Sequence, residues 1–147
     1  MLKIIQDPQD PLLELVKQDP VRPHIPAAQR VGKNAQVLVL MDQQQVPQSV
    51  VCVAFNDHIP TDEQQLFDYD QHQPTVAVLY TIWAIEKGAG RAMIAQVQNH
   101  IRENWPTVSR LVTLSPLTDM ARQFHMRNGA RELQVNPQTQ NFEYLLT

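Results

Sequence analysis

The sequence predicts a single α/β domain built on a mixed sheet, and three neighbouring features predict it. Residues 76–85 form an uninterrupted apolar run, a turn with two glycines follows it, and residues 91–105 then carry apolar side chains at helical spacing. An apolar run rich in β-branched and aromatic residues is typical of a strand covered on both faces. A buried strand followed by a short turn and a helix is characteristic of α/β architecture. With 147 residues, 43% of them hydrophobic, the chain can bury the core that one such domain needs.

The composition excludes several classes of protein. A formal net charge of −3 leaves no broad basic surface, so we do not expect nucleic acid as the principal partner. The single cysteine, Cys52, can build neither a disulfide framework nor a thiolate zinc site, which suits a reducing cytoplasm. The N-terminus lacks the apolar core of a signal peptide, and the longest apolar run is about half the length that crosses a bilayer. We therefore expect a cytoplasmic protein without a membrane segment.

The first 34 residues are expected to wrap around the domain as short helices. Five prolines interrupt them, and Pro11 is well placed to begin one helix with Leu13 and Val16 on its apolar side. Beyond this segment, residues 36–42 and 49–55 are rich in β-branched residues and are joined by a polar link, which predicts an antiparallel pair of strands. The single domain, 1–147, thus divides into a wrapping segment, 1–34, and a sheet core, 35–147.

Local signals predict the remaining elements. Thr61 is expected to cap a short helix that runs to residue 67, and residues 109–116 to form a strand. Residues 118–130 predict a helix that begins at Thr118, buries Met120 and Phe124, and ends at Gly129. The last 17 or so residues predict a hairpin that turns at residues 136–137.

The turn between the apolar strand and the following helix is a candidate anion site. Gly88 and Gly90 let successive backbone amides approach one anion, because neither residue has a Cβ. The helix dipole favours negative charge at this point, and Lys87 and Arg91 add cations. A tight turn that uses glycines only to close the chain is the alternative. The third glycine of a dinucleotide fingerprint and the Gly-Lys-Ser/Thr of a mononucleotide loop are both missing.

Two segments resemble the GNAT acyltransferase superfamily. Residues 86–92 (EKGAGRA) resemble its acyl-CoA pyrophosphate loop, although Ile85 stands where that pattern has Gln or Arg, and residues 118–130 resemble its C-terminal helix motif. The resemblance implies a GNAT-like fold, with a central mixed sheet flanked by helices, that binds a coenzyme A thioester such as acetyl-CoA or malonyl-CoA. Trp83 is either core or a wall of the pantetheine channel. The residues implied in cofactor binding are Trp83, Lys87, Gly88, Ala89, Gly90, Arg91 and Ala92.

Residues 75–130 further resemble the catalytic domain of malonyl-CoA decarboxylase, itself a GNAT-fold enzyme. The blocks that carry this resemblance are LYTI at 79–82, TLSP at 113–116 and FHMRNGA at 124–130. In that family the serine and the histidine of the last two blocks are the catalytic pair, which implies Ser115 and His125 here. The family's N-terminal helical domain and its internal helical insertion have no counterpart in the sequence.

The implied chemistry assigns a role to each member of the pair. Loss of carbon dioxide from a malonyl thioester leaves an enolate, so Ser115 is expected to hydrogen-bond to the thioester carbonyl and His125, with a pKa near 6.5, to transfer the proton. Acyl transfer to an amine is an alternative, in which His125 protonates the departing thiolate and a separate base is needed; Glu86 and Asp119 lie near the right loops. A CoA-binding module without turnover is a second alternative.

No metal site is expected. The other histidines, His24, His58, His72 and His100, lie in unrelated segments without the spacing of metal ligands. The expected partner is a small acyl-CoA, and a homodimer is considered as well.

Overall fold

The computed structural model describes residues 1–146, and these form one mixed sheet with helices on both faces. The strands are β1 (Leu2–Ile5), β2 (Ala35–Met41), β3 (Pro47–Asn56), β4 (Val76–Ala84), β5 (Arg110–Thr113), β6 (Ser115–Pro116), β7 (Arg131–Val135) and β8 (Thr139–Tyr144). The α-helices are α1 (Ala89–Asn104) and α2 (Asp119–Arg127), and three 3₁₀ helices are η1 (Pro11–Gln18), η2 (Ala27–Arg30) and η3 (Glu63–Gln65). The predicted α/β class with a mixed sheet is confirmed.

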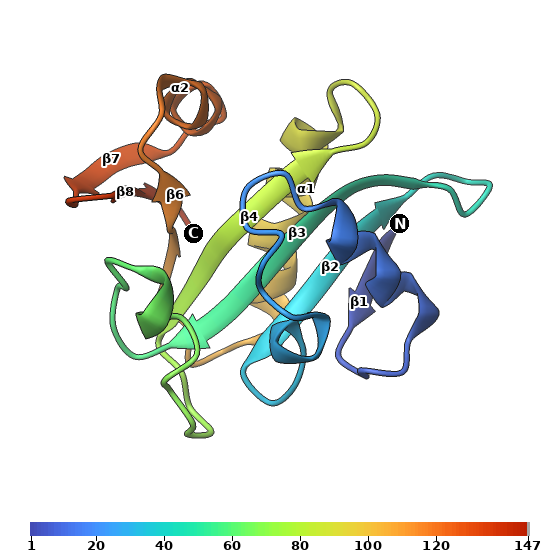
Figure 1. Cartoon of the computed structure of the whole chain (residues 1–147), viewed down its shortest axis with the longest axis horizontal. Helices are drawn as coiled ribbons and strands as arrows, with labels where there is room; N and C mark the ends of the chain where they lie inside the picture. Colours follow the sequence, from blue (N-terminus) through green and yellow to red (C-terminus); the bar gives the residue numbers. More distant parts are fainter. Residues whose placement is uncertain (147) are drawn as a thin grey trace.

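The sheet has the strand order β1-β2-β3-β4-β5-β8-β6, and β7 pairs with β8 (Figure 1). β4 and β5 run parallel, whereas the other described pairs are antiparallel. The predicted central strand is β4, which has neighbours on both sides. The predicted antiparallel pair is β2 with β3, and the predicted terminal hairpin is β7 with β8.

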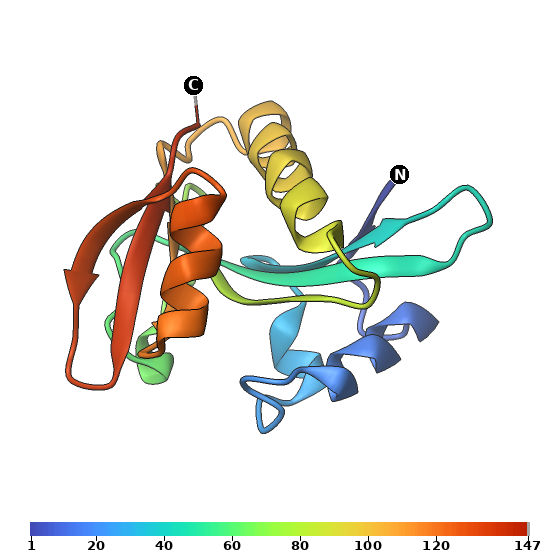
Figure 2. The ribbon, with the colours of Figure 1, turned by 90° about the horizontal axis from the view of Figure 1, so that it is seen from above.

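Helices lie on both faces of the sheet (Figure 2), and an apolar layer is buried on each face. On one face, α1 buries Met93, Val97 and Ile101 against the sheet, as its helical spacing predicts. On the other face, the 3₁₀ helices of the N-terminal segment bury Leu13 and Val16. β4 supplies side chains to both layers, which explains why its sequence is continuously apolar. Among residues 1–146, no helix combines the length and the apolar character that crossing a membrane requires.

β4 and β5 separate halfway along β4. Their parallel pairing ends at Leu79 and Thr113. At the next residue, Tyr80, the pairing of β4 with β3 shifts register, so that Cys52 pairs with Thr81 and Val53 with Leu79. Tyr80 is therefore the extra residue of a β-bulge, which bends a strand and increases its twist. The second half of β4 diverges from β5, and a cavity opens there.

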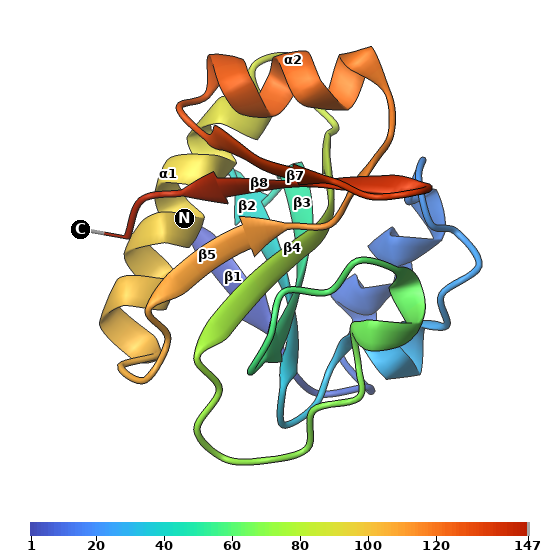
Figure 3. The same cartoon turned by 90° about the vertical axis from the view of Figure 1, so that its left-hand side faces the viewer.

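Three local predictions were wrong. Residues 1–34 contain an edge strand, β1, as well as helices; only Ile5 of its four residues is buried, so its apolar pattern is too short to detect. Asp62 and not Thr61 caps η3, because its carboxylate accepts a hydrogen bond from the Gln65 amide. Met120 is 82% exposed and belongs to neither apolar layer, whereas α2 packs on the β7–β8 hairpin (Figure 3).

Candidate functional site

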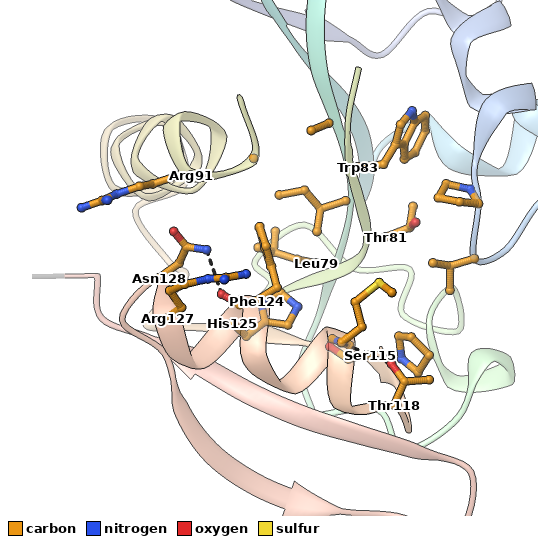
Figure 4. A pocket seen from close by; sticks show the side chains of 18 of the residues that line it. Leu79, Thr81, Trp83, Arg91, Ser115, Thr118, Phe124, His125, Arg127 and Asn128 are labelled. Carbon is orange, nitrogen blue, oxygen red and sulfur yellow. Dashed lines mark hydrogen bonds between the residues drawn. The ribbon is translucent and has the colours of Figure 1, made fainter. Parts of the chain in front are cut away.

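A cavity of about 970 Å³ lies where β4 and β5 diverge. Its walls come from the second half of β4, the beginning of α1, residues 114–116, α2 and two residues of the N-terminal segment. These parts are distant in sequence, and the bulge at Tyr80 brings them around one space. Figure 4 shows the side chains that line it.

Most of the residues singled out from the sequence line this cavity. Ala89 and Ala92 do not: Ala89 is half-buried and Ala92 exposed on α1. The predicted residues that the cavity brings together are Trp83, Lys87, Gly88, Gly90, Arg91, Ser115 and His125.

The Ser115 hydroxyl is held by a buried neighbour. Ser115 is 3% exposed, and its Oγ lies 2.8 Å from Oγ1 of the fully buried Thr113. Oγ1 of Thr113 accepts a hydrogen bond from the Phe142 amide at 3.0 Å. A buried hydroxyl proton without an acceptor is costly, and Ser115 Oγ is the acceptor within reach of the Thr113 proton. The proton of Ser115 is then available to a group in the cavity.

His125 is held in a similar way from the opposite side. Its Nδ1 lies 2.6 Å from the hydroxyl of Tyr144, a residue of β8 that is 2% exposed. Because His125 Nδ1 is the only acceptor for that hydroxyl proton among the described residues, Tyr144 donates and His125 carries its own proton on Nε2. Both Ser115 and His125 thus present a hydrogen-bond donor to the same cavity.

Burial keeps the His125 imidazole neutral. Removal from water lowers the pKa of His125 to about 4, and burial raises that of the Tyr144 phenol well above its ordinary value. The expectation of a His125 pKa near 6.5 was therefore wrong. At neutral pH the side chain is a neutral donor through Nε2 rather than an imidazolium.

The beginning of α1 has the geometry of an anion site. Gly88 is the N-cap residue with a φ of 84°, a left-handed conformation that favours glycine. The amides of the first helical turn have no carbonyl partner within the helix, but that of Ala89 donates to the Glu86 carbonyl at 3.1 Å, so an anion would be bound by the amides that follow it. Gly90 has a further reason to be glycine: a Cβ there would lie 2.9 Å from Cε1 of Phe124 on α2. The close approach of the two helices depends on this residue.

Trp83 lies between the core and the cavity; whether the cavity is the pantetheine channel predicted from the sequence stays a prediction. Its half-buried ring packs against one core layer and also lines the cavity. Its Nε1 is buried and has no hydrogen-bond partner among the described residues.

Several site residues were missed at the sequence level. Thr113 and Tyr144 orient the two donors, Arg127 and Asn128 extend the cavity wall along α2, and Val21 reaches it from the N-terminal segment. Thr113 stands in the TLSP block, so it carried a signal. Arg127 and Asn128 stand in the FHMRNGA block and carried one as well. Val21 and Tyr144 follow no local pattern, because the fold brings them to the site from distant parts of the chain.

The described part of the cavity wall contains no aspartate or glutamate. Glu86 and Asp119, the two candidate bases for amine chemistry, do not line it. Its charged side chains are the cations Lys87, Arg91 and Arg127. Within residues 1–146, no three His, Cys, Asp or Glu side chains gather as a metal site would require.

Comparison with known proteins gave structural matches alone. No family model and no curated protein matches the sequence. Among solved structures, a malonyl-CoA decarboxylase from Rhodopseudomonas palustris matches with a TM-score of 0.80 and 18% identity, over 99% of this chain and 60% of that one. The GphF GNAT-like decarboxylase, solved in complex with isobutyryl-CoA, matches with a TM-score of 0.73 and 14% identity over 100% of both chains. Tetrahymena GCN5 matches with a TM-score of 0.68 and 13% identity, over 100% of this chain and 96% of that one.

The chain spans 38–60% of the length of the malonyl-CoA decarboxylases from three bacteria, which include Agrobacterium vitis and Cupriavidus metallidurans. These matches cover 93–99% of this chain. The chain therefore has the GNAT fold, in a form close to the catalytic domain of malonyl-CoA decarboxylase.

Proposed function

We propose that this protein binds an acyl-CoA thioester and removes carbon dioxide from a malonyl group attached to it. The observation that carries the proposal is the pairing of two oriented hydrogen-bond donors, Ser115 and His125, with a cavity wall that contains no carboxylate. Decarboxylation needs donors for an enolate oxygen and no general base. Transfer to an amine needs a base that removes a proton from the ammonium, and the wall does not supply one.

The coenzyme A would lie with its diphosphate at the beginning of α1. Amides at a helix N-terminus bind phosphate oxygens, and glycine at position 88 allows the backbone to approach them. Lys87 and Arg91 add positive charge at this end, and Arg127 adds it from α2. Trp83, on the adjoining strand, would form part of the wall beside the pantetheine arm. These residues bind the carrier, and the chemistry takes place farther along the cavity.

At the reacting end, the bond between the α-carbon and the carboxylate breaks, and its electron pair passes into the thioester as an enolate. Ser115 Oγ and His125 Nε2 would donate hydrogen bonds to the enolate oxygen, which carries more negative charge than the carbonyl oxygen of the substrate. The α-carbon then takes up a proton from solvent water, so that a malonyl thioester and one proton yield an acetyl thioester and carbon dioxide. With a neutral imidazole, His125 acts here mainly as a donor.

The substrate carboxylate would be poorly stabilised at this position. Among residues 1–146, lysine and arginine line the cavity only at the beginning of α1 and the end of α2. A carboxylate taken from water without a cationic partner is destabilised, whereas neutral carbon dioxide is not. This difference would favour loss of the carboxylate.

Incubation with malonyl-CoA in the absence of an amine tests the proposal. Acetyl-CoA and carbon dioxide are expected in equal amounts, measured by chromatography and by release of labelled gas. Ser115→Ala and His125→Gln are each expected to lower kcat by roughly 10²-fold with little change in CoA affinity. Ser109→Ala, at an exposed serine outside the cavity, is the matched control.

Other outcomes would contradict it. Thiol release that appears only when an amine is added would instead support acyl transfer. A CoA-dependent rise in melting temperature without any product would support a binding module. A cytoplasmic location and a homodimer stay predictions, which fractionation and light scattering can test.

A further inference from the structure

The N-terminal segment forms one wall of the cavity. Residues 19–22, called the strap below, run along the second half of β4, and two of them, Pro20 and Val21, line the cavity. Val21 is 37% exposed, as expected for a side chain that faces an open space. In Figure 4 the blue ribbon of the N-terminal segment lies beside Thr81 and Trp83, on the opposite side of the view from Arg91 and Arg127.

A buried carboxylate fixes the strap. Oδ1 of Asp19 accepts hydrogen bonds from the amides of Val21 and Arg22, at 2.8 and 2.9 Å, and from the Thr81 hydroxyl at 2.9 Å. These bonds, together with others to the same group, hold the pKa of Asp19 below its usual range despite burial. Thr81 itself lines the cavity, so Asp19 ties the strap directly to the adjoining strand, β4.

Two arginines reinforce this arrangement. Arg30, which is fully buried, contacts the second oxygen of Asp19 at 2.7 Å and donates to the carbonyls of Ile25 and Arg22. Arg22 donates to the carbonyl of Tyr80, the bulge residue at which β4 bends away from β5. Loss of either member of a buried ion pair is strongly destabilising, so the strap has one well-defined position. These contacts fasten the strap at Asp19 and at Arg22.

The cavity has two chemically different ends. The cations that line it, Lys87, Arg91 and Arg127, belong to the beginning of α1 and the end of α2. The residues that line it from the strap and the adjoining part of β4, including Val21, Thr81 and Ile82, are uncharged. A diphosphate bound at α1 would therefore direct the acyl group of the same molecule toward the strap.

We propose that Val21 is a specificity-determining residue: held in place by the Asp19–Arg30 pair, it is the wall that the acyl group meets, and it limits the site to short acyl groups. This inference rests on the proposed binding of acyl-CoA. It adds that the size of the accepted acyl group is set by the N-terminal segment rather than by the sheet. A smaller side chain at position 21 should admit longer chains, and a larger one should exclude branched chains.

Calorimetric titration with CoA, acetyl-CoA, isobutyryl-CoA and hexanoyl-CoA tests this inference. The three thioesters carry no carboxylate on the acyl group, so their binding is measured without decarboxylation. The quantity compared is the affinity for each thioester divided by the affinity for CoA. Relative to the unmodified protein, Val21→Ala is expected to raise this ratio for hexanoyl-CoA by about tenfold, and Val21→Phe to lower it for isobutyryl-CoA by about tenfold. The affinity for CoA should stay unchanged in both variants. Val46→Ala removes a valine that is 47% exposed and lies outside the cavity, and it should change none of these ratios.

The outcomes separate the two proposals. If CoA binds equally to all variants and the acyl preferences do not move, Val21 is not the specificity wall and the binding of acyl-CoA stands. If CoA does not bind to the unmodified protein, both proposals are overturned.

Discussion

The Tyr144 hydroxyl donates a hydrogen bond across 2.6 Å to Nδ1 of His125. The two residues are 19 positions apart, on β8 and α2, and both are buried. The bond selects the imidazole tautomer that carries its proton on Nε2, and it does so without placing a charge beside the ring. A carboxylate in the place of Tyr144 would instead favour an imidazolium. A tyrosine partner suits a site whose histidine acts as a neutral donor.

Tyr144→Phe is expected to lower kcat for malonyl-CoA by roughly tenfold, with the affinity for CoA unchanged. The phenyl ring keeps the packing, but the tautomer of His125 is no longer fixed, so a hydrogen bond to the transition state is weakened. Nitrogen-15 NMR of labelled histidine should show the Nε2–H tautomer in the unmodified protein and a mixture in the variant. Equal kcat values and identical spectra would show that Tyr144 has no positioning role. Tyr69→Phe, at a tyrosine outside the cavity, serves as the control.

The pH dependence of turnover should show no change of slope near pH 6.5. Burial lowers the pKa of His125 to about 4, so the imidazole stays neutral between pH 5.5 and 8. Measurement of kcat/KM across that range, together with an NMR titration of the ring, tests this expectation. A titration midpoint near 6.5 would refute the neutral-donor role.

The same shift makes stability depend on pH. Between pH 6.5 and 4 the unfolded chain binds a proton at position 125 that the folded protein does not, so the free energy of unfolding should fall as the pH is lowered through this window. A shift of this size corresponds to about 3 kcal/mol. His125→Gln should flatten this part of the profile, measured by urea unfolding at several pH values. An unchanged slope in the variant would assign the effect to other groups.

Gly90→Ala is expected to destabilise the protein by about 1–3 kcal/mol and to reduce turnover. The added Cβ would lie 2.9 Å from the Phe124 ring, which must move, and that ring is adjacent to His125 with 5.1 Å between ring centroids. Gly129→Ala is a useful comparison, because its φ of 99° costs stability whereas no atom lies within 4 Å of the new Cβ. Urea unfolding and malonyl-CoA turnover should separate the two variants. Full activity in Gly90→Ala would mean that the ring adapts without disturbing His125.

Glu143→Gln is expected to cost about 2 kcal/mol of stability at pH 7. Hydrogen bonds from Arg110, and then from Arg131, lower the pKa of Glu143 to about 2 and connect β8 to β5 and β7. Since this pKa is below its ordinary value, the stabilisation is present above pH 4.5 and is lost as the pH falls toward 2. The difference between the two proteins in urea unfolding should therefore narrow in acid. A difference independent of pH would point to packing instead of charge.

The sequence alone determined those features of the fold and of the candidate site whose evidence lies within one short stretch of residues. The apolar run of β4, the glycine turn and the periodic apolar face of α1 lie within 30 consecutive residues, and they fix both the α/β class and the place of the candidate anion site. Ser115 and His125 were implied by the resemblance of the TLSP and FHMRNGA blocks to malonyl-CoA decarboxylase, and both line the cavity. Local backbone preference and hydrophobic spacing act over such distances, which is why these features can be recognised from the sequence.

Only the tertiary structure determined the hydrogen bonds and the pKa of those residues. The Asp19–Thr81 bond joins residues 62 positions apart, and the Tyr144–His125 bond joins two elements that meet only in the folded chain. The pKa of His125 depends on burial by residues from several strands and helices, so no local pattern encodes it. The bulge at Tyr80 likewise arises from pairing between β3 and β4. Hydrogen bonds, desolvation and strand register are properties of contacts between distant segments, and these exist only once the sheet has formed.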